Sequence, residues 1–187
     1  MGITDDVLKD LKGRIDKTLG DLAQNLAKIR TGRANTAMLD SVKVDFYGTP
    51  TPLNQCAALG VPEPRMITVK PWDKGIIKEI EKAIREANLG FNPMNDGELI
   101  RVPIPALTEE RRKDIAKQVK TKGEEHKVTI RNERRDANEK LKGLLKDKKI
   151  TEDENKRTQE KVQKETDAGV AKVDELVAKK EKEVLEV

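Results

Sequence analysis

The chain has 187 residues, which suits one large domain or two small ones; 39% of its residues are charged and only 2% are aromatic. The hydrophobic share of 35% lies below the fraction of about 45–50% found in ordinary globular domains, which argues against a thick core. Small apolar residues on narrow helical stripes can still bury enough surface to fold. The composition therefore predicts slender helices rather than disorder.

The net charge of +4 is concentrated in one part of the chain. Residues 106–149 carry 15 basic and 9 acidic side chains, a net charge of +6, whereas residues 150–187 carry 8 and 11, a net charge of −3. A basic segment can meet phosphate groups and release their counterions. The same pattern also fits a solvated helix face that balances its acidic neighbour, so both interpretations stay open here.

Cys56 is the single cysteine, so no disulfide can form within the chain. No stretch has the pattern of a signal peptide or a membrane-spanning segment. We therefore expect a cytoplasmic protein without a membrane partner.

An amphipathic helix is predicted near the N-terminus. Its apolar residues, spaced three or four positions apart, are Leu8, Leu11, Ile15, Leu19, Leu22, Leu26 and Ile29. We expect this helix to end at Thr31-Gly32, because glycine adopts the backbone angles that end helices.

Residues 31–105 contain all eight prolines and follow a different pattern. Residues 42–47, 66–69 and 99–102 alternate or are β-branched in the manner of short strands. A helical stripe over residues 76–87 separates the last two. The four aromatic residues of the chain all lie in this segment: Phe46, Tyr47, Trp72 and Phe91. We predict a small α/β domain that folds around its own core, with these aromatics in it.

A second, long helix is predicted after Thr108, which is a suitable N-cap. Its stripe is Ile115, Val119, His126, Ile130, Ala137, Leu141 and Leu144. A helix of this length is a rod of roughly 55 Å. Residues 146–149 then turn the chain, and Thr151 with Glu154 forms a capping box that starts a third helix.

Two long helices joined by a short turn lie antiparallel, and the stripe of the first helix needs the same partners. The sequence therefore predicts an α+β fold: a three-helix bundle of residues 1–30 and 106–187, with an α/β domain of residues 31–105 inserted between the first and second helices. The two crossings between these parts are expected to form a hinge. Its residues are Thr31, Gly32, Arg33, Pro103 and Pro105.

The sequence does not indicate catalysis. His126, the only histidine, falls on an apolar stripe, where a packing role is commoner than metal ligation. Cys56 has no histidine near it, and no glycine-rich phosphate loop is present. Carboxylates alternate with lysines as on a solvated face. We expect no enzymatic activity, no metal and no cofactor.

Three arginines mark the middle of the second helix. At about 100° per residue, Arg131 and Arg135 share one flank, and Arg134 lies beside the apolar seam. The planar guanidinium group suits paired contacts to phosphate oxygens. No aromatic residue lies here to stack on bases, so RNA would be recognised by shape and phosphate position. Alternatively, these arginines pair with Asp136, Glu139 or acidic residues of the third helix.

Five segments together resemble the bacterial ribosome recycling factor family. They are Lys28–Ala34, Tyr47–Leu53, Leu89–Pro93, Leu107–Lys113 and Arg131–Asn138, and the likeness covers essentially the whole chain. The resemblance implies an L-shaped molecule, similar to tRNA in outline, that enters the ribosome after termination. It would act with elongation factor G, which hydrolyses GTP, to split the subunits and free the messenger RNA and the last tRNA.

The resemblance also implies roles for individual residues. The candidate RNA-binding residues are Arg131, Arg134, Arg135, Arg30, Arg33, Lys146 and Lys148. The first three match the family's arginine cluster on large-subunit ribosomal RNA. The next two match the first junction and either contact RNA or set the hinge geometry, and the two lysines are placed at the bundle tip by position alone. The smaller domain is expected to swing and meet the partner factor, and the protein to be a monomer.

Three residues of the second helix depart from the family pattern. Glu133 stands where the family has an apolar residue, and Gly123 and His126 interrupt a stretch that is otherwise richer in alanine. We expect them to loosen the packing of this helix.

Two other functions stay open from the sequence. One is a coiled-coil scaffold that binds a helix of another protein. The other is an enzyme hosted by residues 31–105, which a pocket with converging polar groups would favour.

Overall fold

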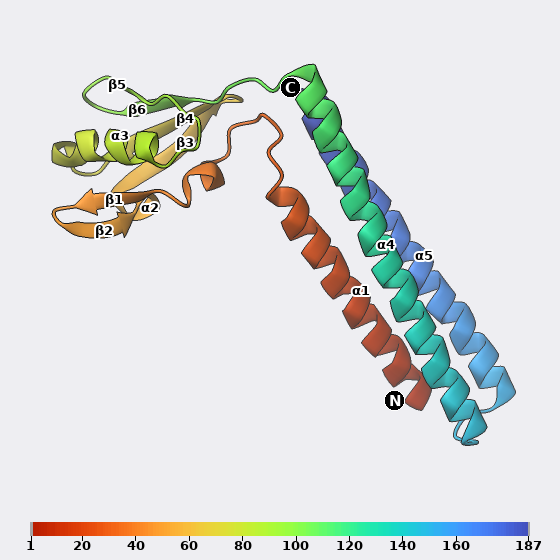
Figure 1. Cartoon of the computed structure of the whole chain (residues 1–187). Helices are drawn as coiled ribbons and strands as arrows, with labels where there is room; N and C mark the ends of the chain where they lie inside the picture. Colours follow the sequence, from red (N-terminus) through yellow and green to blue (C-terminus); the bar gives the residue numbers. More distant parts are fainter. Residues whose placement is uncertain (1, 187) are drawn as a thin grey trace. The chain divides into compact units, whose positions relative to one another are not determined.

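The structure is a computed structural model that describes residues 2–186, and these fold as two units. The first, the bundle, consists of α1 (Ile3–Ala27), α4 (Glu109–Lys146) and α5 (Glu152–Leu185). The second, the insert, spans Thr31–Thr108. The predicted α+β class with three long helices is confirmed (Figure 1).

The three helices of the bundle run side by side, and each contacts the other two (Figure 1). α1 ends earlier than predicted, because Lys28 is already its C-cap and the N–H of Ile29 donates to the carbonyl of Leu26 in a tight turn. Gly32, with a φ of 81°, lies in the connection beyond the helix rather than at its end. The capping box of Thr151 and Glu154 is present as predicted at the start of α5.

The bundle core is narrow and partly polar. Its buried polar side chains are Thr18, His126, Glu133, Thr158 and Thr166. The Thr18 hydroxyl donates to Glu133 Oε1 at 2.8 Å, and His126 Nε2 lies 2.9 Å from Asp21 Oδ2. Both contacts join α1 to α4, so these two positions tie the helices together.

Two glycines let the helices approach closely. A Cβ on Gly123 would lie 2.5 Å from Val177 Cγ2, and a Cβ on Gly169 would lie 2.8 Å from Ile15 Cγ2. Both separations are too short for a real side chain, so a neighbouring helix already fills the space that alanine would take. The expectation that Gly123 loosens the packing of α4 is therefore wrong.

The insert contains a hairpin, a sheet and one main helix. The hairpin pairs β1 (Lys43–Phe46) with β2 (Thr49–Pro52). The antiparallel sheet has the order β3-β4-β6-β5, and its strands are β3 (Ala57–Glu63), β4 (Met66–Pro71), β6 (Ile100–Pro103) and β5 (Met94–Asn95). Two short helices, η1 (Thr36–Leu39) and α2 (Leu53–Cys56), precede β3, and η2 (Lys74–Ile76) leads into α3 (Ile77–Glu86).

The sequence predicted β1, β4, β6 and α3 but missed the other strands. β2 reads Thr-Pro-Thr-Pro, and prolines normally argue against a strand. Here Pro50 and Pro52 lie opposite Asp45 and Lys43, where the ladder needs no N–H from β2. The bond from the N–H of Leu53 to the carbonyl of Val42 continues the same alternation.

The core of the insert is aliphatic. It includes the fully buried side chains of Leu39, Val44, Ile67, Ile80, Ile84 and Ile100. Of the four aromatic residues, Phe91 is buried at 4% exposure, whereas Tyr47 and Trp72 are 72% and 70% exposed. Phe46 is 37% exposed and also lies outside the core, so the expectation that the aromatics form this core is wrong for Phe46, Tyr47 and Trp72.

Within residues 2–186, no helix is both long enough and apolar enough to cross a membrane.

Candidate RNA-binding surface

The middle of α4 presents Arg131, Arg134 and Arg135 beside its buried face. Ile130 and Glu133 point into the bundle, which sets the helical phase and turns the arginines to the flank. Arg131 and Arg135 are exposed, and Arg134 is half-buried. The structure therefore brings these three predicted residues together on one side of α4.

Arg134 is held by a polar contact to α5. Its Nη1 donates to Gln163 Oε1 at 3.1 Å, and Gln163 Nε2 donates to Asp167 Oδ1 at 2.8 Å. Arg131 and Arg134 also line a hollow of about 300 Å³ between α4 and α5. A neutral amide thus orients the guanidinium group of Arg134 without neutralising its charge.

Two carboxylates near the arginines are paired with other basic groups. Asp136 accepts from Arg14 Nη2 at 2.8 Å, and this hydrogen bond raises the pKa of Arg14 above its ordinary value. Asp174 pairs with Lys127, and their hydrogen bond is the main reason that the pKa of Lys127 is raised. Within the described part of the chain, Arg131, Arg134 and Arg135 form no ion pair with a carboxylate. The alternative in which they pair with neighbouring acids is not observed.

The other candidate RNA-binding residues lie elsewhere. Lys146 is the last residue of α4, about 22 Å along the helix axis from Arg131, and Lys148 has a φ of 57° in the following turn. Arg30 and Arg33 follow the end of α1, in the connection to the insert. The structure therefore does not gather all seven predicted residues into one surface.

The predicted hinge residues differ in how firmly they are held. Gly32 lies outside any helix or strand between Thr31 and Arg33. Pro103 is paired with Met66 inside the sheet, and the N–H of Ile104 donates to the carbonyl of Arg65 at 2.8 Å.

Backbone hydrogen bonds hold both ends of the insert against the rest of this unit. On the first crossing, the N–H of Ala34 donates to the carbonyl of Pro64 at 2.7 Å. On the second, the sheet holds the chain as far as Ile104. The connection on that side therefore begins at Pro105 rather than at Pro103.

Sequence reasoning missed the ion pairs that link α1 to α4. Besides Arg14 and Asp136, Lys140 Nζ lies 2.6 Å from Asp10 Oδ2, and this hydrogen bond lowers the pKa of Asp10. Residues so far apart in sequence carry no local signal of pairing. These contacts are exposed, so they orient the helices more than they stabilise them.

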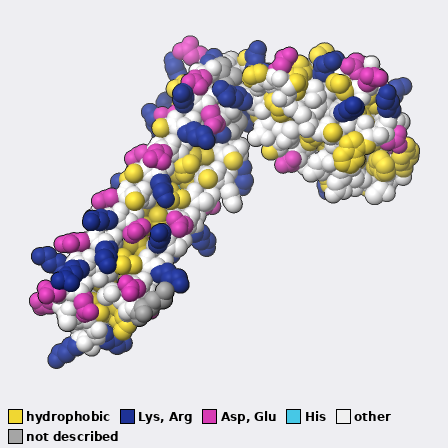
Figure 2. All heavy atoms as spheres, turned by 180° about the vertical axis from the view of Figure 1, so that it is seen from behind, with side chains coloured by type: hydrophobic (Ala, Val, Ile, Leu, Met, Phe, Trp, Pro, Cys, Tyr) yellow, Lys and Arg dark blue, Asp and Glu magenta, His cyan; other side chains and the backbone are white. Residues whose placement is uncertain are grey.

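Side chains of both signs are interspersed along the face of the bundle in view (Figure 2). Asp136 and Asp174, which lie near the arginines, instead pair with Arg14 of α1 and Lys127 of α4. Lysines of α1 and α5 such as Lys12 and Lys164 also form no ion pair among the described residues, so unpaired positive charge is not confined to α4.

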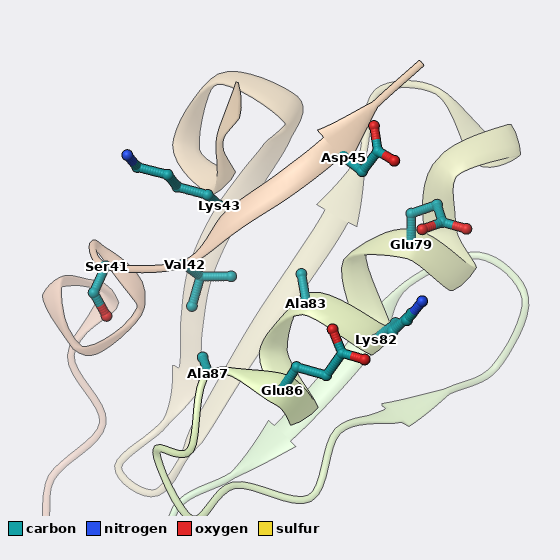
Figure 3. Close-up of a pocket in the computed structure, with 9 residues that line it drawn as sticks. All are labelled: Ser41, Val42, Lys43, Asp45, Glu79, Lys82, Ala83, Glu86 and Ala87. Carbon is teal, nitrogen blue, oxygen red and sulfur yellow. The ribbon is translucent and has the colours of Figure 1, made fainter. Parts of the chain in front are cut away.

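The insert contains a hollow of about 310 Å³ between β1 and α3 (Figure 3). Its floor includes Val42, Ala83 and Ala87, and its rim carries charges of both signs. Figure 3 shows Lys43 directed away from α3, and the side chain of Ser41 has no base bonded to it in the described residues. No activated nucleophile or converging acid and base is present, so this hollow does not favour the enzyme alternative.

His126 and Cys56 have structural surroundings. The Nδ1 atom of His126 lies 2.7 Å from the carbonyl of Lys122, while its other nitrogen faces α1. Cys56 is buried, and burial raises the pKa of its thiol, which disfavours the reactive thiolate. No group of three or more potential ligands that could hold a metal ion occurs among residues 2–186.

Comparison with known proteins gives a consistent result. The family described as ribosome recycling factor matches residues 22–185. The ribosome-recycling factor of Myxococcus xanthus is 69% identical over 97% of this chain and 98% of its own length. That of Clostridioides difficile is 53% identical over 97% and 98%.

Solved structures of the same description also match. A solution structure of the ribosome recycling factor is 37% identical, covers 100% of both chains and has a TM-score of 0.75. The T. thermophilus ribosome recycling factor has a TM-score of 0.62 at 46% identity, over 99% of this chain and 100% of that one. It belongs to models in which it and E. coli elongation factor G are bound to the E. coli post-termination complex.

Proposed function

The chain belongs to the ribosome recycling factor family, and we propose that it binds the post-termination ribosome and, with elongation factor G and GTP, splits it into subunits. Messenger RNA and deacylated tRNA would leave as the subunits separate. The observation that carries this proposal is 69% identity to a ribosome-recycling factor over 97% of the chain. The protein acts as a monomer in the cytoplasm and is not an enzyme.

The arginine surface of α4 anchors the bundle on large-subunit ribosomal RNA. Arg131, Arg134 and Arg135 offer guanidinium groups that no carboxylate of the described chain neutralises, and such groups bind phosphate oxygens in pairs. Arg30 and Arg33 at the first crossing and Lys146 and Lys148 at the far end of α4 add contacts at separate places. RNA would be recognised by its backbone at several points along the rod.

The crossings between the bundle and the insert act as a hinge. Thr31, Gly32 and Arg33 form the first crossing, and Pro105 begins the second, two residues after Pro103 ends β6. Both ends of the insert are tied by backbone hydrogen bonds, so bending is concentrated in these short segments.

The direction of the reaction requires an energy source outside the chain. Binding can shift the equilibrium between joined and separated subunits only by the difference in affinity for the two states. GTP hydrolysis by elongation factor G supplies the free energy that makes subunit separation directional. The bundle holds its site while the insert is displaced through the hinge.

A subunit-splitting assay tests this function. The wild-type chain is expected to split post-termination ribosomes only when both elongation factor G and GTP are present. Arg131→Ala and Arg134→Ala should each weaken ribosome binding and reduce the slope of log affinity against log salt by about 1. The slope is measured by titrating binding at several salt concentrations.

Two control variants make this test specific. Arg131→Lys keeps the charge but loses the guanidinium fork, so it should bind more weakly than wild type with nearly the same salt slope. Arg85→Ala removes an exposed arginine of α3 and should change neither quantity. Unchanged affinity of Arg131→Ala across the salt series would contradict the RNA-binding role of this surface.

A further inference from the structure

The hollow between α4 and α5 combines hydrogen-bond donors, acceptors and apolar side chains in one small space. Its volume of about 300 Å³ is at the lower end of the range for small-ligand sites. The residues that line it include Arg131, Arg134, Gln163, Asp167, Val170 and Ala171. Contacts to phosphate need only the arginines of this set. The carboxylate and the apolar lining therefore call for a further explanation.

Gln163 holds a donor and an acceptor on the two sides of one amide group. Its Oε1 accepts from Arg134 Nη1 at 3.1 Å, and its Nε2 donates to Asp167 Oδ1 at 2.8 Å. Arg134 and Asp167 are thereby fixed a single amide group apart. The hollow presents a guanidinium group, which only donates, beside a carboxylate, which only accepts.

Most of the hydrogen-bonding capacity of this pair is still open. Arginine carries several N–H donors, and each oxygen of an ionised carboxylate can accept more than one hydrogen bond. Within residues 2–186, the Arg134 side chain forms one hydrogen bond and Asp167 accepts one, both with Gln163. Asp174 differs, because its Oδ1 is already paired with Lys127 Nζ at 2.5 Å. Arg134 and Asp167 are therefore the groups that can bind a ligand at its edges.

The rest of the lining suits the faces of a flat ligand. Thr166 is buried, and its hydroxyl donates to the carbonyl of Val162 at 2.8 Å, so that hydroxyl is already bonded. Val170 and Ala171 add apolar surface. Arg131 is exposed and forms no hydrogen bond or ion pair in the described part of the chain. Its planar guanidinium group is free to stack on a base.

Among the four RNA bases, guanine fits this set of groups best. Its O6 and N7 atoms are adjacent acceptors, and arginine binds them with paired hydrogen bonds. Next to O6 lie N1–H and the N2 amino group, which are adjacent donors and suit a carboxylate. Adenine has a donor where guanine has O6, and the pyrimidines have no atom equivalent to N7. No other base offers two acceptors followed by two donors.

We propose that the hollow between α4 and α5 binds one unpaired guanine base of ribosomal RNA. Arg134 donates to O6 and N7, and Asp167 accepts from N1–H and the N2 amino group. Arg131 covers one face of the ring, and Gln163 is a positioning residue. The base is unpaired because N1 and N2 are the atoms that pair with cytosine. This inference rests on the proposed function and adds a base-specific contact to the phosphate contacts.

Chemical footprinting tests the contact directly. Kethoxal reacts with N1 and N2 of unpaired guanines, so saturating wild-type chain should lower its reaction with one guanine of bacterial large ribosomal subunits about fivefold or more. Asp167→Ala, also at saturation, should restore that reaction. Protection of adenine N1 from dimethyl sulfate should be the same for both proteins. The proposal is overturned if no guanine is protected, or if its protection persists with Asp167→Ala.

Affinity for the same subunits gives a second readout, in which the sign of the change decides. If Asp167 were only an acidic neighbour of the RNA, its removal would strengthen binding to phosphate. The proposed contact requires the reverse, a rise in Kd of about fivefold or more for Asp167→Ala. Tighter binding of Asp167→Ala would overturn the proposal.

Glu160→Ala is the matched control for charge. Glu160 is exposed and lies about two helical turns before Asp167, on the same side of α5, but it does not line the hollow. Its removal changes the charge by the same amount and should not raise Kd. Equal weakening by Glu160→Ala and Asp167→Ala would overturn the proposal, because the effect would then not come from the hollow.

Gln163→Leu tests the positioning role. This variant loses both hydrogen bonds of the amide but keeps the charges of Arg134 and Asp167. Kethoxal protection should weaken, whereas the slope of log affinity against log salt should stay as in wild type. Full protection with Gln163→Leu would contradict this role.

Free nucleotides distinguish the source of the base. A millimolar excess of GMP should not displace the chain from large subunits, since a single nucleotide lacks the neighbouring phosphates that the arginines of α4 hold. Displacement by GMP but not by AMP would assign the hollow to a free guanine nucleotide and overturn the RNA contact. A chain that does not bind large subunits counts against the proposed function. Salt-dependent binding that leaves every guanine reactive counts against the guanine site alone.

Discussion

The bundle and the insert differ in the kinds of side chain that they bury. The bundle buries threonines, a histidine and a glutamate among its aliphatic residues, and Gly123 and Gly169 bring its helices into close contact. The insert buries an almost wholly aliphatic core and leaves Tyr47 and Trp72 in solvent.

This difference separates two kinds of surface. The bundle has a thin core, so its helices must be aligned by specific polar contacts such as that between Thr18 and Glu133. Its outer face carries mainly charged side chains, including the arginines of α4. The insert buries Phe91 with its aliphatic residues and leaves the side chains of Tyr47 and Trp72 on its surface.

The largest expected effect comes from the aliphatic core of the insert. Ile80→Ala, at a fully buried position of α3, should destabilise the insert by about 2–5 kcal/mol, because it removes buried methyl groups and leaves a cavity. Hydrogen exchange should accelerate in α3 and β4 while amides of α4 keep their protection. Equal loss of protection in α4 would show that the two units unfold as one.

An intermediate effect is expected in the bundle. Gly123→Ala places a Cβ 2.5 Å from Val177 Cγ2, and the stiff valine side chain cannot easily move away. We expect a loss of about 1–3 kcal/mol in the free energy of unfolding, measured by denaturant titration.

Gly143→Ala is the matched control in the same helix. No atom lies within 4 Å of a Cβ at that position, so alanine should stabilise α4 by about 0.5–1 kcal/mol through its higher helix propensity. Equal effects of the two substitutions would mean that close approach at Gly123 does not determine the packing.

The smallest effect concerns the ionisation of Tyr47. Its hydrogen bond to Asp73 raises the pKa of Tyr47 above the ordinary value of about 10. The contribution of this contact to stability is therefore fully present below about pH 10 and is lost as pH rises through the raised pKa. Because the chain has one tyrosine, tyrosinate absorbance follows this residue alone.

Asp73→Asn should move the absorbance midpoint of Tyr47 down toward its ordinary value. Asp45→Asn is the matched control, since Asp45 Oδ1 accepts from the N–H of Gly48 and does not contact the tyrosine hydroxyl. An unchanged midpoint in Asp73→Asn would show that Asp73 does not hold the Tyr47 hydroxyl as the structure indicates.

Most helices could be predicted from the sequence, and the strands only in part. Helical periodicity identified α1, α3, α4 and α5 because each buries a single face against a neighbour. β2 was not predicted, because its prolines are tolerated only through the register of the hairpin, which the local sequence does not encode. The placement of Tyr47 and Trp72 was missed because an aromatic residue in a small domain normally belongs to the core.

The sequence by itself determined the α+β class, the helical phase that turns Arg131, Arg134 and Arg135 to one flank, and the capping box of α5. These features depend on neighbours within a few turns of helix, so local spacing is enough to predict them. Only the tertiary structure decided that Asp136 bonds to Arg14, leaving the arginine cluster without a carboxylate partner, and that Gly123 brings helices together. Those outcomes depend on which side chains meet across the bundle, at sequence separations where periodicity carries no information.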